Sequence, residues 1–116
     1  MKMLTKEIEK RLPKLYEQDG KGFDAIVHVK FFDAFGSSVW FVTEYDPEER
    51  LCYGWACLNG DLQCAEFGYV GLDELIGLQI AGRSIPRIER DLHFKPVTLR
   101  QAIKDRFNYE VTGNVG

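Results

Sequence analysis

The sequence predicts an α+β fold, in which a four-stranded antiparallel meander sheet lies between an N-terminal helix and a C-terminal helix. Four runs rich in valine and aromatic residues follow one another in the middle of the chain. The connections between them are too short for the crossovers that parallel strands require. Near both ends, apolar residues recur at helical spacing. The four runs cover residues 25–32, 38–45, 51–58 and 62–70.

Length and composition suit one domain spanning residues 1–116. Eight Phe, five Tyr and two Trp give the chain enough apolar surface to offset the entropy lost on ordering. No apolar run approaches the roughly 18 residues of a membrane span. The start Met1-Lys2-Met3-Leu4-Thr5-Lys6-Glu7 soon turns polar, so we expect no signal peptide and a cytoplasmic protein.

The first helix is expected within residues 4–16. Thr5 is a suitable N-cap, because its hydroxyl can accept from a free backbone N–H of the first turn. Pro13 should end or kink this helix near Arg11 or Leu12, since proline has no N–H and its ring collides with the preceding turn. The apolar stripe consists of Leu4, Ile8, Leu12 and Leu15.

The third and fourth strands are predicted to form a hairpin around Asn59-Gly60, the strongest short hairpin signal in the chain. A two-residue turn here places Trp55 opposite Cys64. Neither face of this hairpin is cleanly polar. We therefore expect either that both faces of the sheet are covered, or that one exposes apolar and aromatic side chains to a partner.

Beyond the sheet, residues 71–76 predict one short helical turn, and residues 88–96 are more compatible with an extended chain than with a helix. Thr98 is a suitable N-cap for the last helix, expected over residues 99–107. Its apolar residues Leu99, Ile103 and Phe107 recur every four positions.

Charge is unevenly distributed, and residues 19–74 carry a net charge of −8. Four acids gather around one turn of this segment, and two tryptophans lie in the adjacent strands. This composition predicts binding to a protein with a basic surface. We expect charge reversal of the four acids to abolish that binding and to leave the fold intact. The predicted partner-binding residues are Glu44, Asp46, Glu48, Glu49, Trp40 and Trp55.

An alternative site lies in the basic C-terminal part, since residues 75–116 carry a net charge of +3. Here the chain would bind nucleic acid or a nucleotide. Arg90 is ambiguous, because it falls on the apolar side of an extended segment. It is either a ligand-binding residue or the structural partner of Glu66. The predicted anion-binding residues are Arg83, Arg87, Arg90, His93 and Lys95.

No pattern in the chain indicates catalysis, a metal or a cofactor. The three cysteines, Cys52, Cys57 and Cys64, form no Cys-x-x-Cys pair, and Cys52 and Cys57 should point to opposite faces of one strand. Phosphate-binding glycine patterns are missing from the sequence. We therefore predict a non-enzymatic protein without metal or cofactor, whose thiols are reduced and buried.

Several segments together resemble the domain-of-unknown-function family numbered 2958, over roughly residues 3–96. The resemblance implies a small bacterial protein carried by phages, plasmids or conjugative elements. It assigns no catalytic or binding residue. In that setting it suggests an anti-defence inhibitor, of the anti-CRISPR type, that acts by protein–protein interaction with a host or defence-system protein whose surface is basic. It leaves the oligomeric state open, a homo-oligomer included. The segments are residues 4–8, 29–32, 43–51, 68–69, 72–75 and 88–96.

Overall fold

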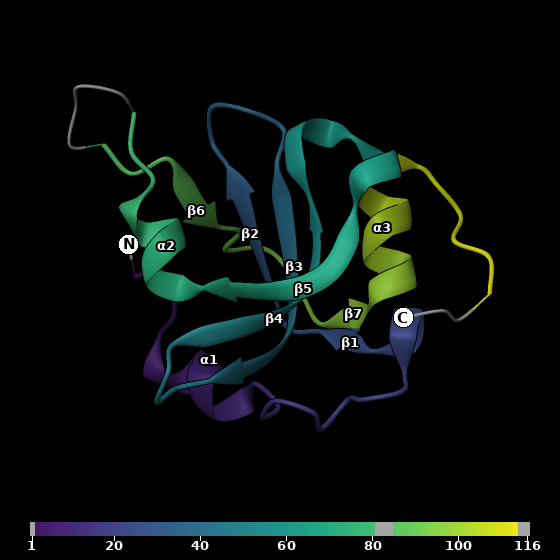
Figure 1. The fold of residues 1–116 in the computed structure, drawn as a ribbon, viewed down its shortest axis with the longest axis horizontal. Helices are drawn as coiled ribbons and strands as arrows, with labels where there is room; N and C mark the ends of the chain where they lie inside the picture. The colour runs from purple at the N-terminus through teal and green to yellow at the C-terminus, as the bar shows by residue number, and fades with distance from the viewer. Residues whose placement is uncertain (1, 81–84, 114–116) are drawn as a thin grey trace.

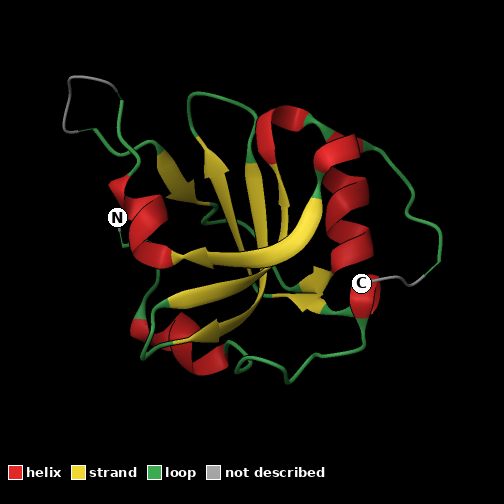
Figure 2. Cartoon of the chain, in the orientation of Figure 1, coloured by secondary structure: helices red, strands yellow, loops and turns green. Residues whose placement is uncertain are grey.

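The structure, a computed structural model, describes residues 2–80 and 85–113. Its main feature is a five-stranded sheet in the order β5-β4-β3-β2-β6, and β1 pairs with β7 in a separate two-stranded sheet (Figures 1 and 2). The strands are β1 (Ile26–Val27), β2 (Val29–Asp33), β3 (Val39–Asp46), β4 (Leu51–Cys57), β5 (Glu66–Gly71), β6 (Ile88–Arg90) and β7 (Val97–Thr98). The helices are α1 (Lys6–Arg11), α2 (Leu72–Gly77) and α3 (Leu99–Phe107).

The predicted α+β class is confirmed, because β2 to β5 form an antiparallel meander with helices at both ends. The strand number was underestimated. β6 adds a fifth strand to the outer side of β2, where Arg90 lies opposite Phe31. β6, β1 and β7 are only two or three residues long. Segments this short carry no readable alternation, so only pairing with distant residues identifies them as strands.

The ends of α1 and α3 follow the predicted capping signals. The Thr5 hydroxyl accepts from the backbone N–H of Ile8 at 3.2 Å, and the Thr98 hydroxyl accepts from that of Gln101 at 3.2 Å. α1 ends at Arg11, two residues before Pro13. Within the described residues, each helix is too short or too polar to cross a membrane.

Both faces of the five-stranded sheet carry a core cluster, which decides between the two predicted arrangements. Figure 1 shows α1 and α2 on one side of the picture and α3 on the other. The first cluster joins α1 and α2 to one face, and includes Leu12, Phe31, Trp40, Tyr45, Leu72 and Leu75. The second joins α3 to the opposite face, and includes Val39, Phe41, Trp55, Leu99 and Ile103.

A β-bulge at Thr43 changes which way the end of β3 faces. Val42 lies opposite Gly54 and Glu44 lies opposite Tyr53, so Thr43 is the extra residue. An extra residue shifts the alternation of side chains by one position. Tyr45 therefore joins the cluster beside α1 and α2, whereas Glu44 turns to the face that carries Tyr53.

The predicted hairpin register is wrong. Trp55 lies opposite Phe67, three residues beyond the expected Cys64. Asn59 does adopt a left-handed conformation, with φ 55°, but the chain then makes a second turn. The Asp61 carboxylate accepts from the backbone N–H of Gln63 at 3.1 Å and holds that turn. Because the shift is an odd number of residues, it exchanges the two faces of β5.

Candidate functional site

Glu44 is a buried carboxylate, 4% exposed, and this corrects the prediction of an acid on an open turn. Its Oε1 accepts from the backbone N–H of Tyr16 at 2.8 Å, and its Oε2 accepts from that of Gln18 at 2.9 Å. These bonds fasten the loop after α1 to the sheet. Charge reversal at this position would bury an opposite charge against two donors. The expectation that reversing all four acids leaves the fold intact assumed exposed side chains, and for Glu44 that assumption is wrong.

Gln18 supports the same loop from the inside and is also buried. Its Nε2 donates to the carbonyl oxygens of Ile26 at 2.8 Å and of Thr43 at 2.9 Å. Its Oε1 accepts from the Ile26 N–H at 2.7 Å. Both the nitrogen and the oxygen of the Gln18 amide are therefore hydrogen-bonded. These bonds fix the position of the loop relative to β3.

The loop and the sheet enclose a cavity of about 110 Å³, which we call the tyrosine pocket. The ring centroids of Tyr53 and Tyr69 are 4.9 Å apart, and Tyr53 stacks on Phe67 with its centroid 6.4 Å away. Aromatic rings and carboxylates thus line the same pocket. The residues that line the pocket include Tyr16, Asp19, Glu44, Tyr53, Phe67 and Tyr69.

The charged groups that line the tyrosine pocket are acidic. Burial, with the charges of Glu44 and Asp19, raises the pKa of Tyr53. A hydrogen bond with the Tyr16 side chain, with burial and nearby charges that include Glu44, raises the pKa of Tyr69 to about 12. Both phenols therefore stay neutral at physiological pH and present uncharged rings beside a carboxylate.

Tyr16 occupies a conformation that bulky residues rarely adopt, with φ 75°. Such a backbone costs of order 1–3 kcal/mol and persists only where surrounding contacts hold it. The bond from its N–H to Glu44 is one such contact. The side chain of Tyr16 is 67% exposed at the rim of the pocket. Strain of this kind is concentrated at ligand-binding sites.

The other predicted partner-binding residues divide into two groups. Glu48 and Glu49 are exposed at the β3–β4 turn, and Asp46 is half-buried. The Asp46 carboxylate accepts from the backbone N–H of Glu48 at 3.0 Å, which shapes the turn. Trp40 and Trp55 are buried in opposite core clusters, so the prediction that they contact a partner is wrong.

β5 forms an edge of the five-stranded sheet. Glu66, Gly68 and Tyr69 are exposed along it. No described strand pairs with its outer side, which leaves backbone donors and acceptors available. Residues 51–82 contain no Lys or Arg, so acids alone supply the charge there. Those acids are Asp61, Glu66, Asp73 and Glu74.

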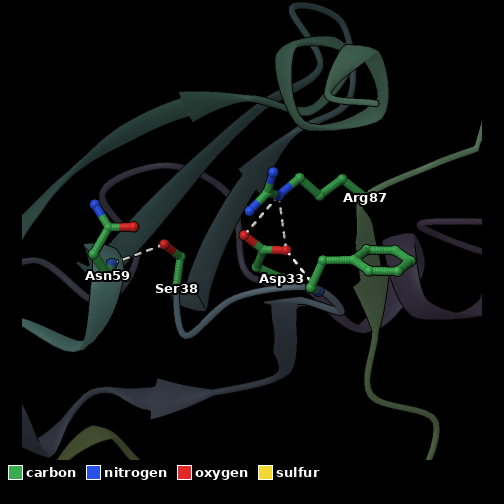
Figure 3. A network of polar contacts seen from close by, with 5 residues as sticks. Asp33, Ser38, Asn59 and Arg87 are labelled. Carbon is green, nitrogen blue, oxygen red and sulfur yellow. Dashed lines mark hydrogen bonds and ion pairs between the residues drawn. The ribbon is translucent and has the colours of Figure 1, made fainter. Parts of the chain in front are cut away.

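Two of the predicted anion-binding residues are used in structural contacts. Arg87 Nε donates to both Asp33 oxygens, at 3.0 and 2.9 Å, as Figure 3 shows. Arg90 Nε donates to the carbonyl oxygen of Met3 at 3.1 Å and holds the N-terminal segment against β6. The expected pairing of Arg90 with Glu66 is wrong, because β6 and β5 are opposite edges of the sheet. Arg83 lies outside the described residues.

His93 and Lys95 are both exposed and line the same depression. They line an open groove of about 400 Å³ together with Lys30 and Arg106. Asp91 and Asp105 line the same groove, and Asp91 pairs with Lys30 at 3.5 Å. The positive charge of this groove is therefore largely balanced by acids.

His28 is expected to make the stability of the protein depend on pH. Burial, followed by the charge of Arg11, lowers the pKa of His28 from its ordinary value of 6.5. The unfolded chain therefore takes up this proton first as the pH falls through about 6.5. We expect stability to decrease below that pH, until the folded protein is protonated as well.

The check for His28 is the urea midpoint of unfolding measured between pH 7.5 and 5. His28→Gln should flatten the profile, whereas His93→Gln, at an exposed position, should leave it as it is. An unchanged slope in His28→Gln would assign the effect to other groups.

The cysteines do not form a site. Cys52 and Cys57 are buried in opposite core clusters, as predicted from their spacing, whereas Cys64 is exposed on the turn before β5 and corrects the expectation that all three are buried. All three are free thiols. In the described part of the chain, no group of three His, Cys, Asp or Glu side chains is arranged to hold a metal ion.

Sequence reasoning missed most of the tyrosine pocket. Tyr16 and Tyr69 are 53 positions apart, so no local pattern in the sequence connects them. In the structure both are exposed and line the same pocket. The sequence contains one indirect indication of the pocket, an acid where an apolar residue is expected. Glu44 lies within a β-strand pattern, where an acid is unusual unless it is paired or bonded.

The sequence model described as "Protein of unknown function (DUF2958)" matches residues 3–103. Neither the curated proteins nor the solved structures contain a match.

Proposed function

The chain belongs to the DUF2958 family, for which no function is described, and from its structure we propose that it is a non-enzymatic binding protein. On this proposal, the acidic edge strand β5 pairs with a basic segment of a partner protein. The observation that carries the proposal is an open strand edge within a stretch that lacks Lys and Arg.

Edge pairing explains how β5 could recognise a partner. An extended segment can add a strand to an exposed sheet edge, with backbone hydrogen bonds for affinity and alternate side chains for specificity. β5 is six residues long, enough for several such bonds. Proteins usually protect an edge strand with lysine, proline or a covering element, and β5 itself has neither lysine nor proline.

Charge supplies the selectivity in this proposal. Glu66 lies at the start of β5, and Glu49 lies at the turn that precedes β4. Neither makes an ion pair among the described residues. Acids arranged in this way steer a basic partner and repel an acidic one.

The wider setting is part of the same proposal. The family resemblance suggests a protein of a mobile genetic element, and in that context the partner is a component of a host defence system, possessing a basic surface. A cytoplasmic location is supported by three free thiols, two of them buried, because such thiols persist in a reducing compartment.

Capture from host lysate tests the proposal. We expect the wild-type protein to retain a partner that the double variant Glu49→Lys, Glu66→Lys binds at least about tenfold more weakly, since placing like charges opposite each other costs several kcal/mol. Quantitative mass spectrometry of the retained proteins is the measurement.

The matched control is Glu7→Lys with Asp105→Lys, which makes the same change of charge at exposed acids on α1 and α3. It should retain the partner. If both double variants lost the partner equally, or if both retained it, the β5 side of the molecule would not be the binding surface.

A second candidate function, anion binding, is favoured by the groove that contains His93, Lys95, Lys30 and Arg106. If it binds nucleic acid, retention on a single-stranded DNA resin should fall steeply with salt and fall further in His93→Ala, Lys95→Ala. If the protein passed through the DNA resin unretained at low salt, nucleic-acid binding by this groove would be excluded.

A further inference from the structure

We propose that the tyrosine pocket binds the guanidinium group of an arginine side chain, presented by the segment that pairs with β5. This inference rests on the proposed function, since it names the side chain that the partner would contribute. The juxtaposition that carries it is a fixed, buried carboxylate beside three tyrosine rings at a sheet edge.

The pocket opens next to the docking strand. Phe67 and Tyr69 belong to β5, and both line the cavity together with Tyr53 of β4. A strand added to β5 would continue the sheet, and every second side chain would project toward the face that carries Tyr69. On this proposal, a long side chain at such a position enters the pocket that Phe67 and Tyr69 line.

The carboxylate inside the pocket has no cationic partner. Glu44 forms no ion pair among residues 2–80 and 85–113. Each of its oxygens accepts one backbone N–H, and a carboxylate oxygen can accept a second bond. A buried charge that already has a fixed orientation and spare acceptor capacity attracts a cationic donor.

The aromatic rings of the pocket select the kind of cation. A cation over a ring face is attracted by the negative face of the π-system. Guanidinium is planar and weakly hydrated, so it stacks on rings and pairs with carboxylates better than a compact, strongly hydrated ammonium. The volume of about 110 Å³ accommodates such a head group but not a nucleotide. Asp19, exposed at the rim, adds further negative charge.

Binding of a small probe tests the inference on the full chain. Ethylguanidinium chloride should shift the backbone amide resonances of Tyr16 and Gln18, which report on Glu44, in a saturable way in the millimolar range. Butylammonium should bind more weakly, and potassium acetate should cause no saturable shift. A linear shift with ethylguanidinium, or tighter binding of butylammonium, would overturn the proposal.

Variants separate the rings from the fold. Tyr69→Ala removes a half-exposed ring and should weaken ethylguanidinium binding at least fivefold, while Tyr69→Phe, which keeps the ring face, should retain most of it. Asp19→Asn should weaken it about twofold to threefold. Tyr109→Ala removes an equally exposed tyrosine beyond α3 and should change nothing. Unchanged binding in Tyr69→Ala would refute the site.

This result is distinguishable from failure of the proposed function. Glu49→Lys, Glu66→Lys leaves the tyrosine pocket unaltered and should still bind the probe. Saturable probe binding without partner capture would sustain the pocket and reject edge docking. Partner capture that depends on Glu49 and Glu66, with no saturable probe binding, would sustain edge docking and reject the pocket.

Discussion

Replacing Glu44 with glutamine is expected to destabilise the protein by about 2–5 kcal/mol, because hydrogen bonds to a charged acceptor contribute roughly 1.5–3 kcal/mol each. Glutamine offers one acceptor oxygen, whereas two backbone N–H groups, those of Tyr16 and Gln18, bond to Glu44. Its amide nitrogen would face one of those donors. One buried N–H and one NH₂ group would then lack an acceptor.

The measurement for Glu44→Gln is urea unfolding, with hydrogen exchange as a local readout. The amides of Tyr16 and Gln18 should exchange much faster than in the wild type. Glu48→Gln, at the exposed turn, is the control and should stay within about 0.5 kcal/mol. Wild-type stability in Glu44→Gln would mean that the loop is held by Gln18 and not by the carboxylate.

Replacing Gly54 with alanine is expected to cost about 3 kcal/mol or more, at the upper end of overpacking effects. A Cβ at this position would collide with the carbonyl oxygen of Phe41, and would lie 3.0 Å from the Cα of Val42. Both obstacles are backbone atoms of β3, next to the bulge at Thr43. They cannot rotate away as a side chain could.

Gly68 provides a matched control, because it lies directly opposite Gly54 in the β4–β5 register. A Cβ on Gly68 would meet no atom within 4 Å. Gly68→Ala should therefore leave the urea midpoint unchanged or raise it slightly. Equal destabilisation of the two variants would show that strand propensity, rather than the contact with Phe41, governs this pair.

The acidic turn illustrates how far sequence reasoning reached. Glu44, Asp46, Glu48 and Glu49 look alike as a charge cluster, and exposure is correct for Glu48 and Glu49. Glu44 differs because the bulge at Thr43 turns it to the inner face of a folded loop. The alternation of residue types contains no sign of that extra residue.

The roles of the arginines in the basic segment could not be predicted for a related reason. Charge marks Arg87 and Arg90 as candidates for anion binding, and the position of Arg90 on the apolar side of its segment also predicts a structural role. Their actual partners, Asp33 and the Met3 carbonyl, are 54 and 87 positions away. No local pattern contains such pairings, since they depend on β6 joining the outer side of β2.

What the sequence determined by itself is local. Thr5 and Thr98 cap the starts of α1 and α3, which end at Arg11 and Phe107. A cap or a proline acts within one turn of the backbone, so nearby residues are enough to predict it. Antiparallel order followed from short connections in the same way. The tertiary structure alone decided the β4–β5 register, the burial of Glu44 and the gathering of Tyr16 with Tyr69. Each of these depends on the free energy of contacts between segments that are distant in the chain, and such contacts exist only once the sheet has formed.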